Sequence, residues 1–185
     1  GQAHLNPAYA EAILREFSFD FTIGSLHFFR GNKDLYDVTY TPENVDARIR
    51  QYFSETLEMI ETGGFHSLGH LDYIMRRLDA CFEGAPTYRG YEEPIDQILS
   101  QLVARDMALE VNTSGLRKWL GCIGLEPWVL RRFRALGGRY VTIGSDAHVR
   151  ADIGAGLSEA LALIQSAGFS HYTYYKNGAP IEVAI

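Results

Sequence analysis

The sequence predicts an α/β fold in which parallel strands are covered by outer helices. Short runs of apolar and β-branched residues alternate along the chain with longer segments whose apolar residues recur at helical spacing. Alternating units of this kind are typical of parallel sheets with helices outside them. A closed eight-unit barrel needs about 200 residues or more, so a chain of 185 residues with four or five strands corresponds to the back part of a barrel.

The first half of the chain opens on a helix rather than on a strand. Asn6 can cap this helix, and Pro7 suits its first position. Residues 19–29 then form a predicted strand with His27 near its end. Residues 41–62 follow as a long amphipathic helix, which a pair of glycines ends and which we expect to serve as scaffold.

The second half continues the alternation and ends in a hairpin. The predicted elements are strands over 65–74 and 107–113, helices over 94–105 and 127–136, a strand from Val141 and a helix over 152–167. The tail over 171–185 alternates like an edge hairpin, with Asn177-Gly178 as its turn. No repeat, linker or low-complexity segment interrupts this order, so we expect residues 1–185 to form one domain.

The composition of the chain argues against some classes of binding partner. A net charge of -6 and a pI near 5.5 give no general attraction to nucleic acid or to an anionic membrane, so an anionic substrate needs a local cluster of positive charge. Cys81 and Cys122 lack metal-type spacing and suit the interior of a reduced protein. No apolar run is long enough for a membrane span, and no charged-then-apolar leader is present, so we expect a cytoplasmic protein.

Side chains able to bind a metal or polarise a substrate stand at the end of every predicted parallel strand. They are His27, His70 with Asp72, Glu110 with Asn112, and Asp146 with His148. The carboxyl ends of parallel strands meet at one edge of the sheet, where such folds place their chemistry. Mixed imidazole and carboxylate ligands favour zinc, manganese or iron. The sequence therefore predicts a transition-metal site at this edge.

The last strand end carries the clearest pair. If the strand geometry persists through Gly144, the period of two sends Asp146 and His148 to the same side of the sheet. The alternative is an Asp146 that caps the following helix, with His148 facing solvent. His27 taken alone also has a structural interpretation, because a single histidine at a strand end is more often a core residue.

Four segments together resemble the polymerase-and-histidinol-phosphatase (PHP) domain superfamily, in particular its histidinol-phosphatase branch. They are Ser25-Leu26-His27-Phe28, Gly69-His70-Leu71-Asp72, Glu110-Val111-Asn112-Thr113-Ser114-Gly115 and Gly144-Ser145-Asp146-Ala147-His148. Each is weak alone, but their order and spacing cover nearly the whole chain. The resemblance implies the C-terminal part of a distorted (βα)7 TIM-like barrel with parallel strands and outer helices, and a cluster of up to three divalent transition metals, Zn, Mn or Fe.

The resemblance also implies roles for individual residues. By motif, His27 and His70 look like ligands of one metal, Asp146 of a second and His148 of a third. Arg76 and Arg117 are similar to the basic residues that bind phosphate in the family, although a solvated charge or a surface loop explains each of them equally simply. Asp72, Glu110 and Asn112 are expected to orient the ligands rather than to bind metal. The implied nucleophile is a metal-bound hydroxide, so no side chain is assigned as catalytic.

One departure from the family pattern is large. The family begins with a His-x-His strand, followed by a further histidine and a bridging glutamate, and none of these precedes the opening helix here. We expect about the first three strands to lie ahead of Gly1 in the intact protein, because a parallel barrel without them exposes two unpaired edges. The alternative is a shortened, inactive relative. The chain as it stands is expected not to assemble the complete metal cluster.

The implied function is the metal-dependent hydrolysis of a phosphate monoester, with L-histidinol phosphate, an intermediate of histidine biosynthesis, as the first substrate to test. Other small phosphates or nucleotides, and a metal-binding remnant without activity, are the alternatives. A small phosphorylated molecule is the expected partner, and the oligomeric state is not predicted. Trp119 is a candidate wall for an imidazole-bearing substrate or a packed loop aromatic.

Overall fold

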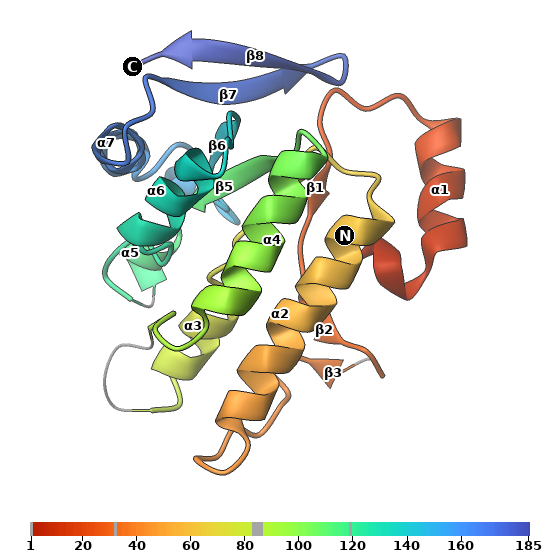
Figure 1. The fold of residues 1–185 in the computed structure, drawn as a ribbon, viewed down its shortest axis with the longest axis vertical. Helices are drawn as coiled ribbons and strands as arrows, with labels where there is room; N and C mark the ends of the chain where they lie inside the picture. Colours follow the sequence, from red (N-terminus) through yellow and green to blue (C-terminus); the bar gives the residue numbers. More distant parts are fainter. Residues whose placement is uncertain (1, 32, 83–86, 119) are drawn as a thin grey trace.

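A four-stranded parallel sheet forms the centre of the fold (Figure 1). The structure is a computed structural model that describes residues 2–31, 33–82, 87–118 and 120–185. The strand order is β1-β4-β5-β6, so each strand lies beside its neighbour in chain order within the sheet. The four strands are β1 (Ile23–Gly24), β4 (Ser67–Leu68), β5 (Ala108–Asn112) and β6 (Val141–Gly144). The predicted parallel arrangement is confirmed.

A row of helices packs on one face of this sheet. They are α2 (Val45–Thr62), α4 (Glu92–Ala104), α6 (Pro127–Ala135) and α7 (Leu157–Ser166). Figure 1 shows α2 and α4 side by side in front of the sheet, and α4, α6 and α7 follow in contact. Their apolar stripes contribute a large part of the core, and Ile95, Ile98, Leu99 and Leu102 of α4 are fully buried.

Strand β5 shows how the sheet divides its two faces. Leu109 and Val111 are fully buried in the hydrophobic core, whereas Glu110 and Asn112 alternate with them and are also buried. Ser67 of β4 and Thr142 of β6 join their hydroxyl groups 2.8 Å apart, although β5 separates their strands. The face away from the helices is therefore lined by polar groups that bond to one another, as in the interior of a curved sheet.

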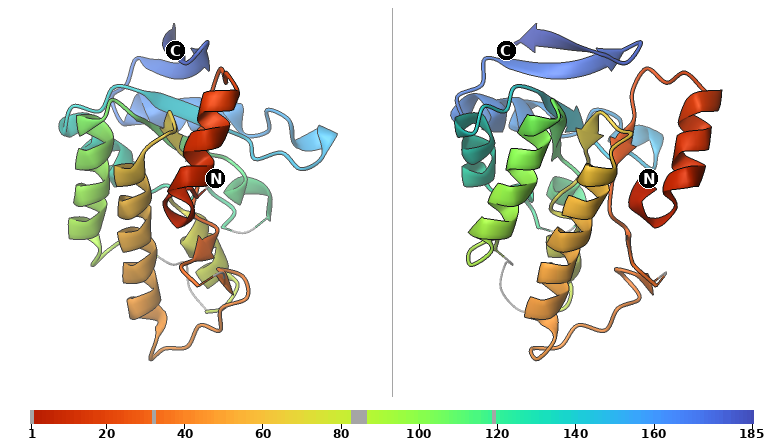
Figure 2. Two further views of the ribbon diagram at one scale, coloured as in Figure 1. Left: turned by 90° about the vertical axis from the view of Figure 1, so that its right-hand side faces the viewer. Right: turned by 45° about the vertical axis from the view of Figure 1, so that its right-hand side comes forward.

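The N-terminal helix stands apart from the core. A 3-10 turn, η1 (Ala3–Leu5), leads into α1 (Pro7–Glu16), and the Asn6 side chain accepts a hydrogen bond from the backbone of Tyr9, which confirms the predicted cap. None of the residues of α1 is buried. Figure 1 and the right panel of Figure 2 show this helix at the side of the protein body.

Two predicted strands are shorter than the sequence pattern indicated. The stretch 19–29 contains only β1 and then β2 (Phe28–Phe29), which pairs with β3 (Lys33–Asp34) in a separate antiparallel hairpin. The stretch 65–74 contains only β4, because His70 has a φ of 27° and α3 (Tyr73–Asp79) follows at once. A left-handed residue breaks the extended backbone that a longer strand needs.

The predicted helix over 152–167 begins later than expected. Gly154 and Gly156 have φ values of 72° and 77°, which interrupt the helix, so that η2 (Arg150–Asp152) stands alone and α7 starts at Leu157. A short α5 (Gly115–Lys118) follows β5. The C-terminal tail forms the predicted hairpin of β7 (His171–Lys176) and β8 (Ala179–Ala184), and Asn177 and Gly178 both have positive φ, as a tight two-residue turn requires.

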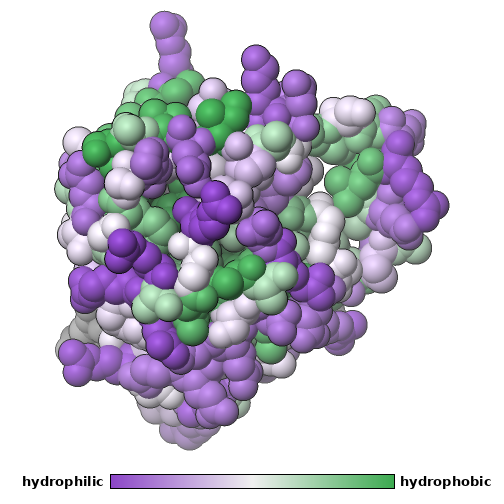
Figure 3. Space-filling view, turned by 45° about the horizontal axis from the view of Figure 1, so that its top comes forward, coloured by the Kyte–Doolittle hydropathy of each residue, from purple (hydrophilic) through white to green (hydrophobic). Residues whose placement is uncertain are grey.

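The sheet is open, with β1 and β6 as its edge strands. Large apolar side chains are exposed near both margins: Phe17, Phe19 and Ile23 on the β1 side, and Val149, Ile153 and Leu157 after β6. The left panel of Figure 2 shows the segment around residue 150 projecting from the body, and Figure 3 shows hydrophobic surface next to α1 at the right margin. The described residues thus form a parallel α/β sheet and not a closed barrel. No helix among them is long and apolar enough to cross a membrane.

A matched pair of leucine substitutions tests this division between core and margin. Leu99→Ala removes a side chain with no exposed surface and should lower the free energy of unfolding by about 2–5 kcal/mol. Leu14→Ala in α1, where the side chain is 38% exposed, should lower it by less than about 1 kcal/mol. Urea unfolding of both variants measures the difference. Equal losses would show that α1 belongs to the cooperative core.

Candidate metal and phosphate site

Two histidines meet at the carboxyl ends of β1 and β4. The Nε2 atoms of His27 and His70 are 3.2 Å apart, and the rings meet edge to face with their centroids 4.8 Å apart. His70 is 7% exposed and His27 is half-buried. Tyr73 at the start of α3 packs against both rings. The sequence prediction that these two histidines lie together agrees with this geometry.

The surroundings keep both imidazoles neutral near pH 7. Burial is the largest cause that lowers the pKa of His70, to about 4, and the positive charge of Arg76 and the nearby His27 add to it. Burial also lowers the pKa of His27. A neutral imidazole offers a nitrogen lone pair, which is the form that binds a metal. Both histidines are therefore in the protonation state that metal binding requires.

The pair fits one half of a tetrahedral zinc site. Two nitrogen ligands at about 2.0–2.1 Å from a tetrahedral ion lie about 3.3 Å from each other, close to the observed separation. The Nδ1 atom of His70 is buried without a hydrogen-bond partner among the described residues. Within 2–31, 33–82, 87–118 and 120–185, however, no three His, Cys, Asp or Glu side chains form a metal-binding group. The described residues thus offer two candidate ligands, which is short of a complete coordination shell.

Asp146 lies just beyond the end of β6, on strained backbone. Its φ is 51°, in the left-handed region, and its side chain is 27% exposed. Its Oδ2 accepts a hydrogen bond from Nη1 of Arg76 at 3.2 Å, and Oγ of Ser114 is also 3.2 Å away. Burial opposes ionisation of this carboxyl, but the positive charge of Arg76 and its hydrogen bond to the carboxylate outweigh burial and hold the pKa of Asp146 below the usual range.

His148 lies next to Asp146, although not through continued strand geometry. The extended backbone ends at Gly144, so the condition of the period-of-two argument is not met. The His148 side chain is 73% exposed, and its Nδ1 lies 2.9 Å from the backbone oxygen of Asp146 and 3.8 Å from the carboxylate Oδ1. The structure thus places His148 on the rim of the site, and its role as a metal ligand stays a prediction.

Arg76 is a buried centre of the site rather than an exposed charge. Its Nε and Nη2 donate to the two carboxylate oxygens of Asp72 at 2.7 and 2.9 Å, and its Nη1 donates to Ser114 at 2.7 Å as well as to Asp146. The side chain has no exposed surface. Burial alone would lower the pKa of Arg76, but the carboxylates of Asp72 and Asp146 raise it, so the guanidinium stays charged. Its predicted role in binding phosphate remains untested.

Glu110 and Asn112 connect the ends of neighbouring strands. The carboxylate Oε2 of Glu110 accepts the backbone N–H of His70 at 2.7 Å and the side-chain amide of Asn112 at 3.2 Å. Burial raises the pKa of Glu110 in spite of these hydrogen bonds. Gly144 makes room for this arrangement, because a Cβ there would overlap the Glu110 carboxylate. Through these contacts, Glu110 and Asn112 fix the backbone at His70, a candidate metal ligand.

Arg117 approaches the site from the other side of Asp146. Its Nη2 donates to the backbone carbonyl of Ser145, and its Nε is 3.5 Å from a carboxylate oxygen of Asp152. Its Nη1 is buried without a hydrogen-bond partner among the described residues. Since this side chain is 18% exposed whereas that of Arg76 is not exposed at all, Arg117 is the better placed of the two to meet an incoming anion.

The sequence reasoning missed Ser114 and Tyr73. Ser114 contacts Arg76, Asn112 and Asp146 through a single hydroxyl group. The spacing of Asn112 and Ser114 is a signal for it, because the backbone N–H of Ser114 bonds to the Asn112 side chain, as in an Asx turn. Trp119, proposed as a wall for the substrate, lies outside the described residues.

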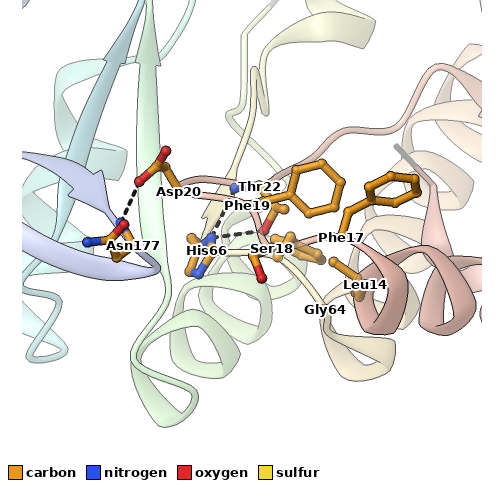
Figure 4. Close-up of a pocket in the computed structure, with 10 residues that line it drawn as sticks. Leu14, Phe17, Ser18, Phe19, Asp20, Thr22, Gly64, His66 and Asn177 are labelled. Atoms are coloured by element: carbon orange, nitrogen blue, oxygen red, sulfur yellow. Dashed lines mark hydrogen bonds between the residues drawn. The ribbon is translucent and has the colours of Figure 1, made fainter.

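A cavity lies at the end of the sheet opposite to the histidine pair. It measures about 710 Å³, and it is lined by the end of α1, by residues 17–20 and by His66, which precedes β4 (Figure 4). The Nδ1 atom of His66 accepts the backbone N–H of Thr22 at 2.9 Å. The cavity shares no residue with the histidine pair, and it lies beside the open β1 edge.

Two curated proteins have sequences similar to that of this chain. A relative named "Probable histidinol-phosphatase" in Clostridium acetobutylicum is 34% identical over 158 residues, which cover 84% of this chain and 61% of the relative. A protein of the same name in Thermotoga maritima is 35% identical over 153 residues, covering 83% of this chain and 58% of the relative. The chain thus spans about three fifths of the length of these curated relatives.

A solved structure shares the fold. The crystal structure of histidinol phosphate phosphatase from Lactococcus lactis subsp. lactis Il1403, complexed with zinc, L-histidinol and phosphate, matches with a TM-score of 0.72 and 22% identity. The match covers 94% of this chain and 66% of that one. The family model of the PHP domain matches residues 3–114, which is more than half of the chain. The chain therefore belongs to the PHP domain family.

Proposed function

We propose that this chain is the larger part of a metal-dependent phosphatase that hydrolyses L-histidinol phosphate to L-histidinol and phosphate. The observation that carries the proposal is the neutral pair of His27 and His70, with Asp146 held nearby by a buried arginine. The identity with relatives named histidinol-phosphatase supports the substrate, since two of them reach 34% and 35%.

The proposal includes a further part of the polypeptide. Residues 1–185 form a single PHP-type domain that lacks about the first three strands of the family fold, and these strands supply the remaining metal ligands. Both the open sheet and the exposed apolar residues at its two margins support this, as does the greater length of the relatives. With the added strands, the sheet closes into the (βα)7 barrel.

His27, His70, Asp146 and His148 are the residues of this chain that would hold the metals, up to three of them, with Zn, Mn or Fe as candidates. When bound, such ions supply Lewis-acid activation of water and of the phosphoryl group. Glu110 and Asn112 orient the backbone that carries His70, while Asp72 fixes Arg76. Arg117 lies where its charge can offset that of a phosphate in a protein whose net charge is -6.

The first experiment measures phosphate release by the full-length protein that contains this chain. Treatment with a chelator should abolish release from L-histidinol phosphate, and added Zn or Mn should restore it. His70→Asn and Asp146→Asn should each lower kcat more than about 100-fold, because even the loss of a group that only orients a ligand costs about 10–100-fold. Asn tolerates the positive φ at both positions, so the fold is kept.

His171→Asn is the matched control, because His171 is exposed on β7 and bonds only locally, to Ser170. It should keep the activity of the unaltered protein. Side-by-side assays with AMP and p-nitrophenyl phosphate separate the proposed substrate from other phosphate monoesters. Full activity of the metal-stripped His70→Asn protein would refute the assignment. Metal binding without any hydrolysis would favour a non-catalytic relative, which the incomplete ligand set of the described residues also fits.

The two arginines should respond differently to the same substitution. Arg76→Met leaves the buried carboxylate of Asp72 without its partner and should lower the free energy of unfolding by about 3–5 kcal/mol. Arg117→Met should lower it by less than about 1 kcal/mol. It should, however, reduce kcat/KM about 10–100-fold if its charge meets the phosphate. Thermal unfolding and steady-state kinetics of both variants give the comparison, and an Arg76→Met protein of unchanged stability would contradict the structural role.

A further inference from the structure

A chain of hydrogen bonds connects the two proposed ligands His70 and Asp146. The backbone N–H of His70 donates to Glu110, and the Asn112 side chain donates to the same carboxylate oxygen. The Asn112 carbonyl oxygen accepts the backbone N–H of Ser114 at 3.0 Å and lies 2.7 Å from its hydroxyl. The hydroxyl in turn lies 3.2 Å from Oδ2 of Asp146. The chain crosses the ends of β4, β5 and β6.

The Ser114 hydroxyl is the junction of this chain. A serine hydroxyl has one hydrogen to donate and two lone pairs to accept with. Nη1 of Arg76 donates to it at 2.7 Å, so its own hydrogen goes to Asn112 or to Asp146. Ser114 is 2% exposed, so water does not replace these partners. The hydroxyl can therefore accept from Arg76 and donate to Asp146, while the backbone N–H of Ser114 keeps the bond to Asn112.

The same hydroxyl distinguishes the two oxygens of the Asp146 carboxylate. Oδ2 accepts from Arg76 and contacts Ser114, whereas Oδ1 is 3.8 Å from Nδ1 of His148, beyond hydrogen-bond distance. The backbone of Asp146 has a φ of 51°, which few residues adopt without support. Arg76 and Ser114 thus hold Oδ2 toward the interior of the protein. These two contacts set the orientation of the Asp146 carboxylate.

We propose that Ser114 is a positioning residue that, together with Arg76, holds Oδ2 of Asp146 so that Oδ1 is presented to the metal. Through Asn112 and Glu110 it also ties this carboxylate to the backbone of His70. The proposal rests on the proposed function, since it concerns how this chain places its own ligands. Arg76 keeps both of its bonds to Asp72 without Ser114, so removing the hydroxyl leaves the buried ion pair in place.

The test is the affinity of the full-length protein for zinc, measured at pH 7 by competition with a chromogenic chelator. Ser114→Ala should weaken zinc binding about 10–100-fold, the usual effect of removing a group that orients a metal ligand. The unfolding midpoint of the metal-free protein should fall by no more than about 4 °C. Ser114→Thr, which keeps a hydroxyl, should bind zinc more tightly than Ser114→Ala.

Ser67→Ala is the matched control, because Ser67 is equally buried and bonds to Thr142 rather than to any site residue. It should leave zinc affinity unchanged. If Ser114→Ala does not fold, Ser114→Val is compared with Ser114→Thr, since the two side chains have nearly the same shape and differ in the hydroxyl group. Zinc affinity that is unchanged in the Ser114 variants, or lowered equally by Ser67→Ala, overturns the proposal while the phosphatase activity of the unaltered protein stands. An unaltered protein that binds no zinc overturns both.

Discussion

The buried pairing of Arg76 with Asp72 is the interaction on which the rest of the site depends. A guanidinium without exposed surface has to be neutralised by partners inside the protein, because water cannot reach it. Asp72 accepts hydrogen bonds from Nε and Nη2, and Nη1 reaches from α3 to Ser114 and Asp146. One charge therefore sets the relative positions of α3, the end of β5 and the turn after β6.

The sheet supplies the frame for this charge by separating its two faces. On β5 the side chains of Leu109 and Val111 stabilise the fold against the helices, and Glu110 and Asn112 between them serve the site. On β5, a substitution of Leu109 or Val111 is thus expected to affect mainly stability, and a substitution of Glu110 or Asn112 mainly the proposed site. Because the sheet separates its two faces, the buried polar groups on one face can lie next to the continuous hydrophobic core on the other.

Much of the fold could be predicted from the sequence, and so could part of the site. The helices α1, α2, α4 and α6 lie within a few residues of their expected bounds, because caps, prolines and glycines mark helix ends locally. The predicted strand lengths were wrong, because apolar alternation over 65–74 does not show where a partner strand stops. His27 and His70 lie together as expected. The burial of Arg76 and the role of Ser114 depend on contacts between distant elements, which no local pattern encodes.

The left-handed backbone at His70 and Asp146 has an evolutionary consequence. A β-branched residue at either position would strain the chain, whereas asparagine and glycine adopt such φ values readily. If His70 and Asp146 are the proposed ligands, a single change to asparagine or glycine at either position would preserve the backbone and remove a ligand. Intact folding of a related chain would then say little about its activity.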